Sequence, residues 1–123
     1  MSMPLTLKKI LQSIKNMQTE TITNENGTAI KYPDGTMICY GRKSISNVEF
    51  SPAGAIYYSA TQTITYPAQF IETPSTNISC RTSNMAWAGN IISNNNNCTF
   101  NILHSTNVTR PVSIEWISIG RWK

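Results

Sequence analysis

Side chains capable of acid–base, nucleophilic or metal chemistry are few and scattered in this sequence. There is one histidine, His104, and the three cysteines, Cys39, Cys80 and Cys98, show no Cys-x-x-Cys spacing. A nucleophile needs a positioned base, and a structural zinc site needs four Cys or His ligands at close spacings. We therefore expect the cysteines to be buried free thiols that act as small apolar side chains, and we expect no metal site and no cofactor.

The carboxylates offer no obvious catalytic pair. The main candidates are Asp34, Glu49, Glu72 and Glu115, which are well separated along the chain. Glycoside hydrolysis needs two carboxyl groups that face one cleft. Asp34 is expected in a turn and Glu115 on the solvent side of a strand. No phosphate-binding glycine motif is present either, so the sequence predicts a protein that binds rather than an enzyme.

Recognition of a saccharide is the chemistry that the remaining polar residues could support. It needs flat aromatic faces or planar polar groups at the rim of a shallow site. The candidate contacts are loop residues: His104, Ser105, Asn107 and Arg110 in one loop, and Asn95 and Asn96 in another. The alternative is a solvated loop for the first set and a turn that tolerates left-handed backbone conformations for the second. Trp87 and Trp116 are expected inside strands, in the core or at a subunit interface.

Short strands must position these loops. The clearest is residues 56–66, where apolar and polar residues alternate with period two. Further strands are expected over residues 28–32, 37–41, 75–81, 85–92, 98–103 and 112–119, with a turn at Pro33-Asp34-Gly35 and a break at residues 51–54. Short strands at roughly 8–12-residue spacing favour an antiparallel β-sandwich or barrel.

The first twenty residues follow a different period. A 4-3-4-3-4 spacing, typical of a coiled-coil seam, relates Met3, Leu7, Ile10, Ile14, Met17 and Thr21. Isoleucine at both seam positions favours a coiled coil of three or more helices. A helix this short is marginal in water unless it packs against another part of the protein. We predict a homotrimer whose interface includes Leu7, Ile10, Ile14 and Met17, and also Trp116. The alternative is one amphipathic helix packed on its own domain.

Charge and hydropathy exclude two classes of partner. Only 13% of residues are charged, and the net charge of +4 is divided between the first 21 residues and the rest without forming a basic cluster. Nucleic-acid binding usually shows such a cluster, so we expect none. No apolar run approaches the length of about 18 residues that a membrane helix needs, and the first residues do not resemble a signal peptide. We expect synthesis in a cytoplasm and no membrane insertion.

Two segments resemble known protein families. Residues 26–39, N-G-T-A-I-K-Y-P-D-G-T-M-I-C, with a final G-R-W at residues 120–122, resemble tail-fibre and baseplate proteins of phages that infect Gram-positive bacteria. Residues 70–119 are similar to the H-type lectins. That likeness is carried by Phe70 with Pro74, residues 84–93, Phe100, and S-I-E-W-I-S-I at residues 113–119.

The H-type lectin resemblance implies a six-stranded antiparallel β-sandwich that assembles as a trimer and binds sugar near its subunit interfaces. The family's sugar-contacting arginine falls at Ala86, and the family loop that carries Trp and His contacts corresponds to residues 104–109, which contain no tryptophan. The family's specificity for N-acetylgalactosamine is therefore not inherited. The expected organisation is a trimerising coiled-coil helix (residues 1–21), a connecting β-hairpin region (22–45) and a lectin-like β-sandwich head (46–123).

Together these features predict the receptor-binding tip of a bacteriophage tail fibre. We expect a virion component that attaches to a host cell-envelope glycan and contacts other phage tail or baseplate proteins. The alternatives are a purely structural tail or baseplate knob, a free-standing cellular lectin and, least favoured, a depolymerase.

Overall fold

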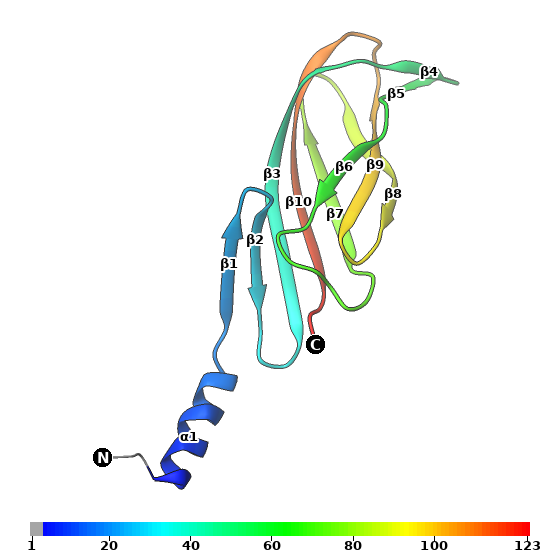
Figure 1. The fold of residues 1–123 in the computed structure, drawn as a ribbon. Helices are drawn as coiled ribbons and strands as arrows, with labels where there is room; N and C mark the ends of the chain where they lie inside the picture. Colours follow the sequence, from blue (N-terminus) through cyan, green and yellow to red (C-terminus); the bar gives the residue numbers. More distant parts are fainter. Residues whose placement is uncertain (1–3) are drawn as a thin grey trace.

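The computed structural model describes residues 4–123, which form one helix and ten β-strands (Figure 1). In chain order these are α1 (Leu5–Asn16), β1 (Glu20–Asn24), β2 (Gly27–Lys31), β3 (Thr36–Val48), β4 (Ser51–Ala53), β5 (Ile56–Tyr58), β6 (Gln62–Thr65), β7 (Ser75–Arg81), β8 (Ala86–Ser93), β9 (Asn97–His104) and β10 (Arg110–Arg121). Sheet A has the order β1-β2-β3-β10-β7. Sheet B has the order β4-β5-β9-β6, and β8 also pairs with β9. Neighbouring strands are antiparallel throughout.

The core lies between the two sheets. In β9 and in β10 up to residue 118, every second residue is buried, because successive side chains of a strand point to opposite faces of its sheet. The inward side chains include Phe100 and Ile102 from β9 and Ile114 and Trp116 from β10. Phe70, from the loop after β6, is fully buried among them. The alternating sequence thus produces two-faced strands, and the predicted β-sandwich class is confirmed.

The ten strands outnumber the seven expected from the sequence pattern and the six that the H-type lectin resemblance implies for the sandwich. β1 was not predicted, and β4 lies in a segment that we expected to break the chain. The predicted strand at residues 56–66 is split by Ser59, whose hydroxyl accepts the Ile102 backbone N–H at 2.9 Å. A side chain here replaces a carbonyl as the partner of β9, which interrupts the ladder. β3 crosses the expected boundary between residues 45 and 46, so the hairpin region and the head share sheet A.

The C-terminal residues close onto the Pro33-Asp34-Gly35 turn between β2 and β3. The Trp122 backbone N–H donates to the Gly35 carbonyl at 2.9 Å, and the Trp122 indole N–H donates to the Tyr32 carbonyl at 2.8 Å. Arg121 donates to the Asp34 carbonyl at 2.8 Å. Gly35 has φ of 98°, and a Cβ there would collide with the Arg121 guanidinium, so only glycine fits this clasp.

The helix stands apart from the sandwich (Figure 1). α1 ends at Asn16, and Thr21, the last expected seam position, lies in β1. Met3 falls outside the described residues. All the described side chains of α1 are exposed, including Leu7, Ile10 and Ile14. The helix therefore does not pack on the sandwich of its own chain, contrary to the alternative considered above.

The three cysteines are free thiols. Cys39 and Cys98 are buried and Cys80 is half-buried. Burial raises the pKa of Cys39 to about 11 and also raises the pKa values of Cys80 and Cys98. The thiols therefore stay protonated near neutral pH, as expected for apolar packing groups.

Asp34 makes stability depend on pH. Its carboxylate accepts the Thr36 backbone N–H at 2.8 Å, and this bond, assisted by the Arg121 charge, lowers its pKa below 3.8. A lowered folded-state pKa contributes stability that is complete above the unfolded pKa and is lost as the pH falls through the folded value. We expect Asp34→Asn, which keeps an acceptor oxygen at every pH, to lose less free energy of unfolding below pH 3.8 than the unmodified chain. Urea denaturation measured on both sides of that pH tests this, and identical losses would contradict it.

Candidate functional site

The loop between β9 and β10 is built on a buried histidine. His104 ends β9 on the inward face and is fully buried, with the Phe50 ring centroid 5.1 Å from its own. Its Nδ1 accepts the Thr106 backbone N–H at 2.9 Å, which leaves the proton on Nε2 to donate to the Ser83 carbonyl, also at 2.9 Å. Both ring nitrogens are used within the chain. Contrary to the prediction, His104 offers neither of them to a ligand.

Arg110 is the second buried side chain of this loop. Its guanidinium donates to the Ser83 carbonyl and hydroxyl at 3.0 and 2.6 Å, to the Thr106 hydroxyl at 2.9 Å and to the Val108 carbonyl at 3.0 Å. A charge removed from water needs such bonds to offset its lost hydration. Arg110 therefore holds the loop in shape, and it is not the exposed sugar contact that the sequence led us to expect.

The other predicted contacts are separated. Ser105 is half-buried and its N–H donates to the Met85 carbonyl, whereas Asn107 is exposed. Asn95 and Asn96 lie in the turn before β9, at the opposite end of that strand. β9 has eight residues, so the two loops are roughly 23 Å apart at about 3.3 Å per residue. One chain cannot combine them in a single small site.

The two mid-strand tryptophans have different environments. Trp116, predicted at the trimer interface, is only 4% exposed and lies 5.8 Å from the Tyr66 ring, so it belongs to the core of a single chain. Trp87 is 42% exposed, on the outer face of sheet B. The sequence suggested the core or a subunit interface for both residues, but only topology decides which face is covered.

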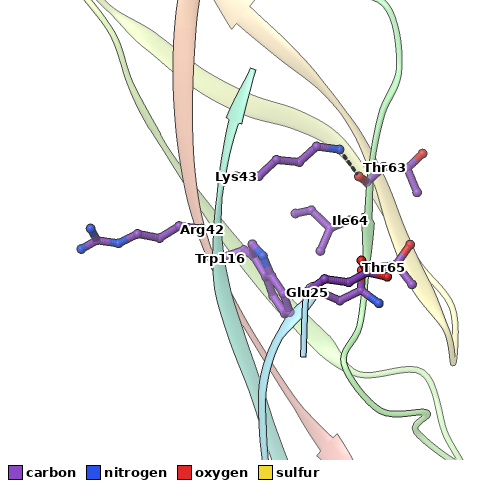
Figure 2. Close-up of a pocket in the computed structure, with 8 residues that line it drawn as sticks. Glu25, Arg42, Lys43, Thr63, Ile64, Thr65 and Trp116 are labelled. Carbon is purple, nitrogen blue, oxygen red and sulfur yellow. Dashed lines mark hydrogen bonds between the residues drawn. The ribbon is translucent and has the colours of Figure 1, made fainter. Parts of the chain in front are cut away.

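A cavity of about 220 Å³ lies beside the β1–β2 turn (Figure 2). It is lined by Glu25, Asn26, Arg42, Lys43, Thr63, Ile64, Thr65 and Trp116. Lys43 donates to the Thr63 carbonyl at 2.8 Å, and Figure 2 shows the Arg42 head group pointing away from the other lining residues. The cavity brings a carboxylate, an amide and hydroxyls close to an indole ring, but it is smaller than the roughly 300–1,000 Å³ of typical ligand pockets. Its residues come from distant segments, so no local sequence signal could have found it.

The outer face of sheet A carries an apolar cluster, the sheet A patch, formed by Ile30, Ile38, Tyr40, Ile117 and Ile119. Cross-strand pairing joins Tyr40 to Ile117, and Ile38 to both Ile30 and Ile119. Tyr40, Ile117 and Ile119 are exposed, and Ile30 and Ile38 are half-buried. Large contiguous apolar surfaces are typical of interaction sites.

Charged side chains flank the sheet A patch. Glu115, one row beyond Ile117 on the same face of β10, lies 3.2 Å from Arg42 and 3.6 Å from Arg81. Both arginines are largely exposed, so these surface ion pairs contribute little to the stability of one chain. They give this face both signs of charge beside its apolar centre.

Neither a metal cluster nor a membrane helix is found in residues 4–123. Within that range no three His, Cys, Asp or Glu side chains are grouped to hold a metal ion. No helix of the same part of the chain is long and apolar enough to cross a membrane.

Comparison with known proteins identifies the fold. No protein-family model matches the sequence, and no curated protein matches it. An N-truncated R1-type pyocin tail fibre matches with a TM-score of 0.65 and 12% identity, over 98% of this chain and 99% of the other. The chain has a tail-fibre fold. A C-terminal fragment of the P. aeruginosa R1 pyocin fibre also matches, with a TM-score of 0.60 and 15% identity, over 84% of this chain and 28% of that one.

The fold agrees with the tail-fibre part of the first of the two resemblances. An overlap of 98% of this chain must include α1 as well as the sandwich. The relation to the H-type lectins stays a prediction.

His104 should be a stability residue. His104→Ala leaves the Thr106 N–H without its acceptor and removes one of the two donors to the Ser83 carbonyl, the other being Arg110, which costs about 1–3 kcal/mol. Urea denaturation would measure this loss. Asn107→Ala, in the exposed part of the same loop, is the control and should stay within about 0.5 kcal/mol of the unmodified chain. Equal stabilities of the two variants would show that the buried ring is dispensable.

Proposed function

We propose that this chain is the receptor-binding tip of a bacteriophage tail fibre, a homotrimer that attaches the virion to a host cell-envelope saccharide. The observation that carries the proposal is the fold similarity to a pyocin tail-fibre fragment over nearly the full length of both chains. The chain acts by binding and not by catalysis, and other phage tail or baseplate proteins hold it in the virion. The depleted charge and the abundance of neutral polar side chains suit contact with a hydrated glycan.

The helix supports self-association. Helix α1 has twelve residues, and an isolated helix of that length is marginal in water. Its exposed apolar side chains include Leu7, Ile10 and Ile14, and exposed Met17 follows at the C-cap. Their alternating spacing of three and four residues is that of a coiled-coil seam, and isoleucine at both seam positions favours a coiled coil of three helices. Three copies of α1 would cover these side chains.

The sheet A patch supports a second contact between copies. It lies on the same sheet as β1, which begins four residues after α1 ends. Copies aligned by their helices therefore start their sandwiches side by side. Burial of the patch would remove its apolar side chains from water, and the charges around Glu115 could pair with those of a neighbour.

The mass in solution tests the assembly. We expect light scattering to give about 41 kDa, three times the 13.7 kDa of one chain. Ile10→Ser with Ile14→Ser, and separately Ile117→Ser with Ile119→Ser, should each shift the mass toward that of one chain. Ile91→Ser with Ile92→Ser, exposed positions of β8, is the control and should keep the trimer mass. A mass of 13.7 kDa for the unmodified chain would contradict the proposal.

Binding to cells tests the function. The fluorescently labelled chain should bind some strains in a panel of bacteria, and it should compete with phage adsorption to those strains. Removal of the envelope polysaccharide should abolish the binding, because the saccharide is the proposed receptor. An intact trimer that binds no strain would instead support the purely structural knob.

A further inference from the structure

We propose that the outer face of sheet B binds a neutral saccharide, on a platform formed by Trp87, Leu103 and Tyr58 beside the side-chain amides of Asn90 and Asn101. This inference rests on the proposed function and assigns the glycan contact to particular residues. We call these five residues the sheet B platform.

The apolar part of the sheet B platform is a row across three strands. Leu103 of β9 pairs with Trp87 of β8 on one side and with Tyr58 of β5 on the other. Its neighbours in the chain, Ile102 and His104, are buried and face the core, so Leu103 and its two partners face outward. Trp87 is 42% exposed and Tyr58 is 40% exposed. Two aromatic side chains thus stand on either side of a leucine, about 10 Å apart at the usual strand spacing.

The polar part of the sheet B platform is a fixed pair of amides. Asn101 is the next outward residue of β9; its Nδ2 donates to the Ser59 carbonyl at 2.9 Å and its Oδ1 accepts from Asn90 Nδ2 at 3.1 Å. Asn90 has φ of 53° and lies where the β8–β9 register shifts. Such a bulge re-aims side chains and is common next to functional sites. Each amide retains a donor and an acceptor beyond these bonds, so the pair can serve sugar hydroxyls without reorganising.

Gly89 lets Leu103 cover the surface between the two parts. It pairs with Asn101, two residues along β8 from Trp87. A Cβ at Gly89 would come within 2.6 Å of Leu103 Cδ1, so Leu103 leans over the space that a side chain would occupy. Glycine inside a strand often marks close approach of another molecule to the backbone. A sugar ring that lies on Trp87 would therefore reach the two amides across the Leu103 side chain, with no side chain of residue 89 in between.

The absence of charge on these strands specifies the class of saccharide. β5, β8 and β9 contain no Asp, Glu, Lys or Arg residue. Flat aromatic faces with a few placed amides suit a neutral sugar, whose C–H groups cover an aromatic ring while its hydroxyls bond at the edge. In the proposed trimer the sheet A patch faces other copies, which leaves the sheet B platform turned outward on each chain. Three shallow sites on one trimer would then gain avidity.

Glycan binding by the full-length chain tests the platform. The probe is an array of neutral and acidic bacterial envelope oligosaccharides. We expect the unmodified chain to bind neutral members, and Trp87→Ala and Tyr58→Ala each to weaken that binding about three- to tenfold. Asn90→Gly, which removes the amide but tolerates the positive φ, should weaken it as well. Ile71→Ala, an exposed position at the other end of the sandwich, is the matched control and should bind normally.

The possible outcomes separate this inference from the proposed function. Array binding that survives in Trp87→Ala and Tyr58→Ala would overturn the platform and leave the receptor-binding role intact. Binding restricted to acidic members would overturn the neutral class. Failure of the unmodified trimer to bind any glycan or cell would overturn both proposals. Hydroxyl-radical footprinting of the unmodified chain, which does not depend on variants that fold, should show Trp87 and Tyr58 protected by a bound oligosaccharide, and no protection would count against the platform.

Discussion

The antiparallel pairing of β3 with β10 is the constraint on which the rest of the structure depends. It runs from Thr36 opposite Arg121 to Val48 opposite Arg110, with one irregularity near Arg110. β2 joins sheet A only through β3, and β7 joins it only through β10. Side-chain hydrogen bonds stabilise both ends of this pairing. At one end the Trp122 indole donates to the Tyr32 carbonyl, and at the other the Arg110 guanidinium donates to the Ser83 carbonyl. Sheet B packs its apolar face on this frame, and the outer faces of both sheets remain available for binding.

The sequence predicted the regular strands of this fold. The predictions failed where contacts with distant parts of the chain decide whether a segment forms a strand or a side chain is buried. The alternation of Cys98, Phe100 and Ile102 placed β9 almost to the residue, and the strand expected at residues 75–81 has the bounds of β7. β1 has a single half-buried apolar residue, Ile22, and gave no such signal. The split at Ser59 depends on a hydroxyl bond to β9 that no local pattern reveals. The inward position of His104 could have been read from its shared parity with Phe100 and Ile102. The burial of Arg110 could not, because its partners lie elsewhere in the chain.

The low sequence identity to the pyocin fibre structures is consistent with different constraints on the inward and the outward residues of the sandwich. A β-sandwich needs inward residues that are apolar and of suitable volume, and many sequences satisfy that need. Outward residues are free of the packing constraint, so they can differ between proteins of the same fold. With only 12% and 15% identity, a common fold says little about which face a protein uses. In this chain the two outer faces differ in kind: one is apolar with charged neighbours, and the other is uncharged, with aromatic and amide groups.

The position of β1 has a mechanical consequence. The chain passes from α1 into β1 at Glu20 and reverses at the turn between Asn24 and Gly27, so the helix is attached at the open end of the β1–β2 hairpin. A pull on α1 along the strand direction acts at right angles to the hydrogen bonds between β1 and β2. It therefore shears all the bonds of the hairpin together and does not peel them apart one at a time. A fibre anchored through its helix would resist detachment under drag best when the force is axial, and least when it is applied sideways to the sheet edge.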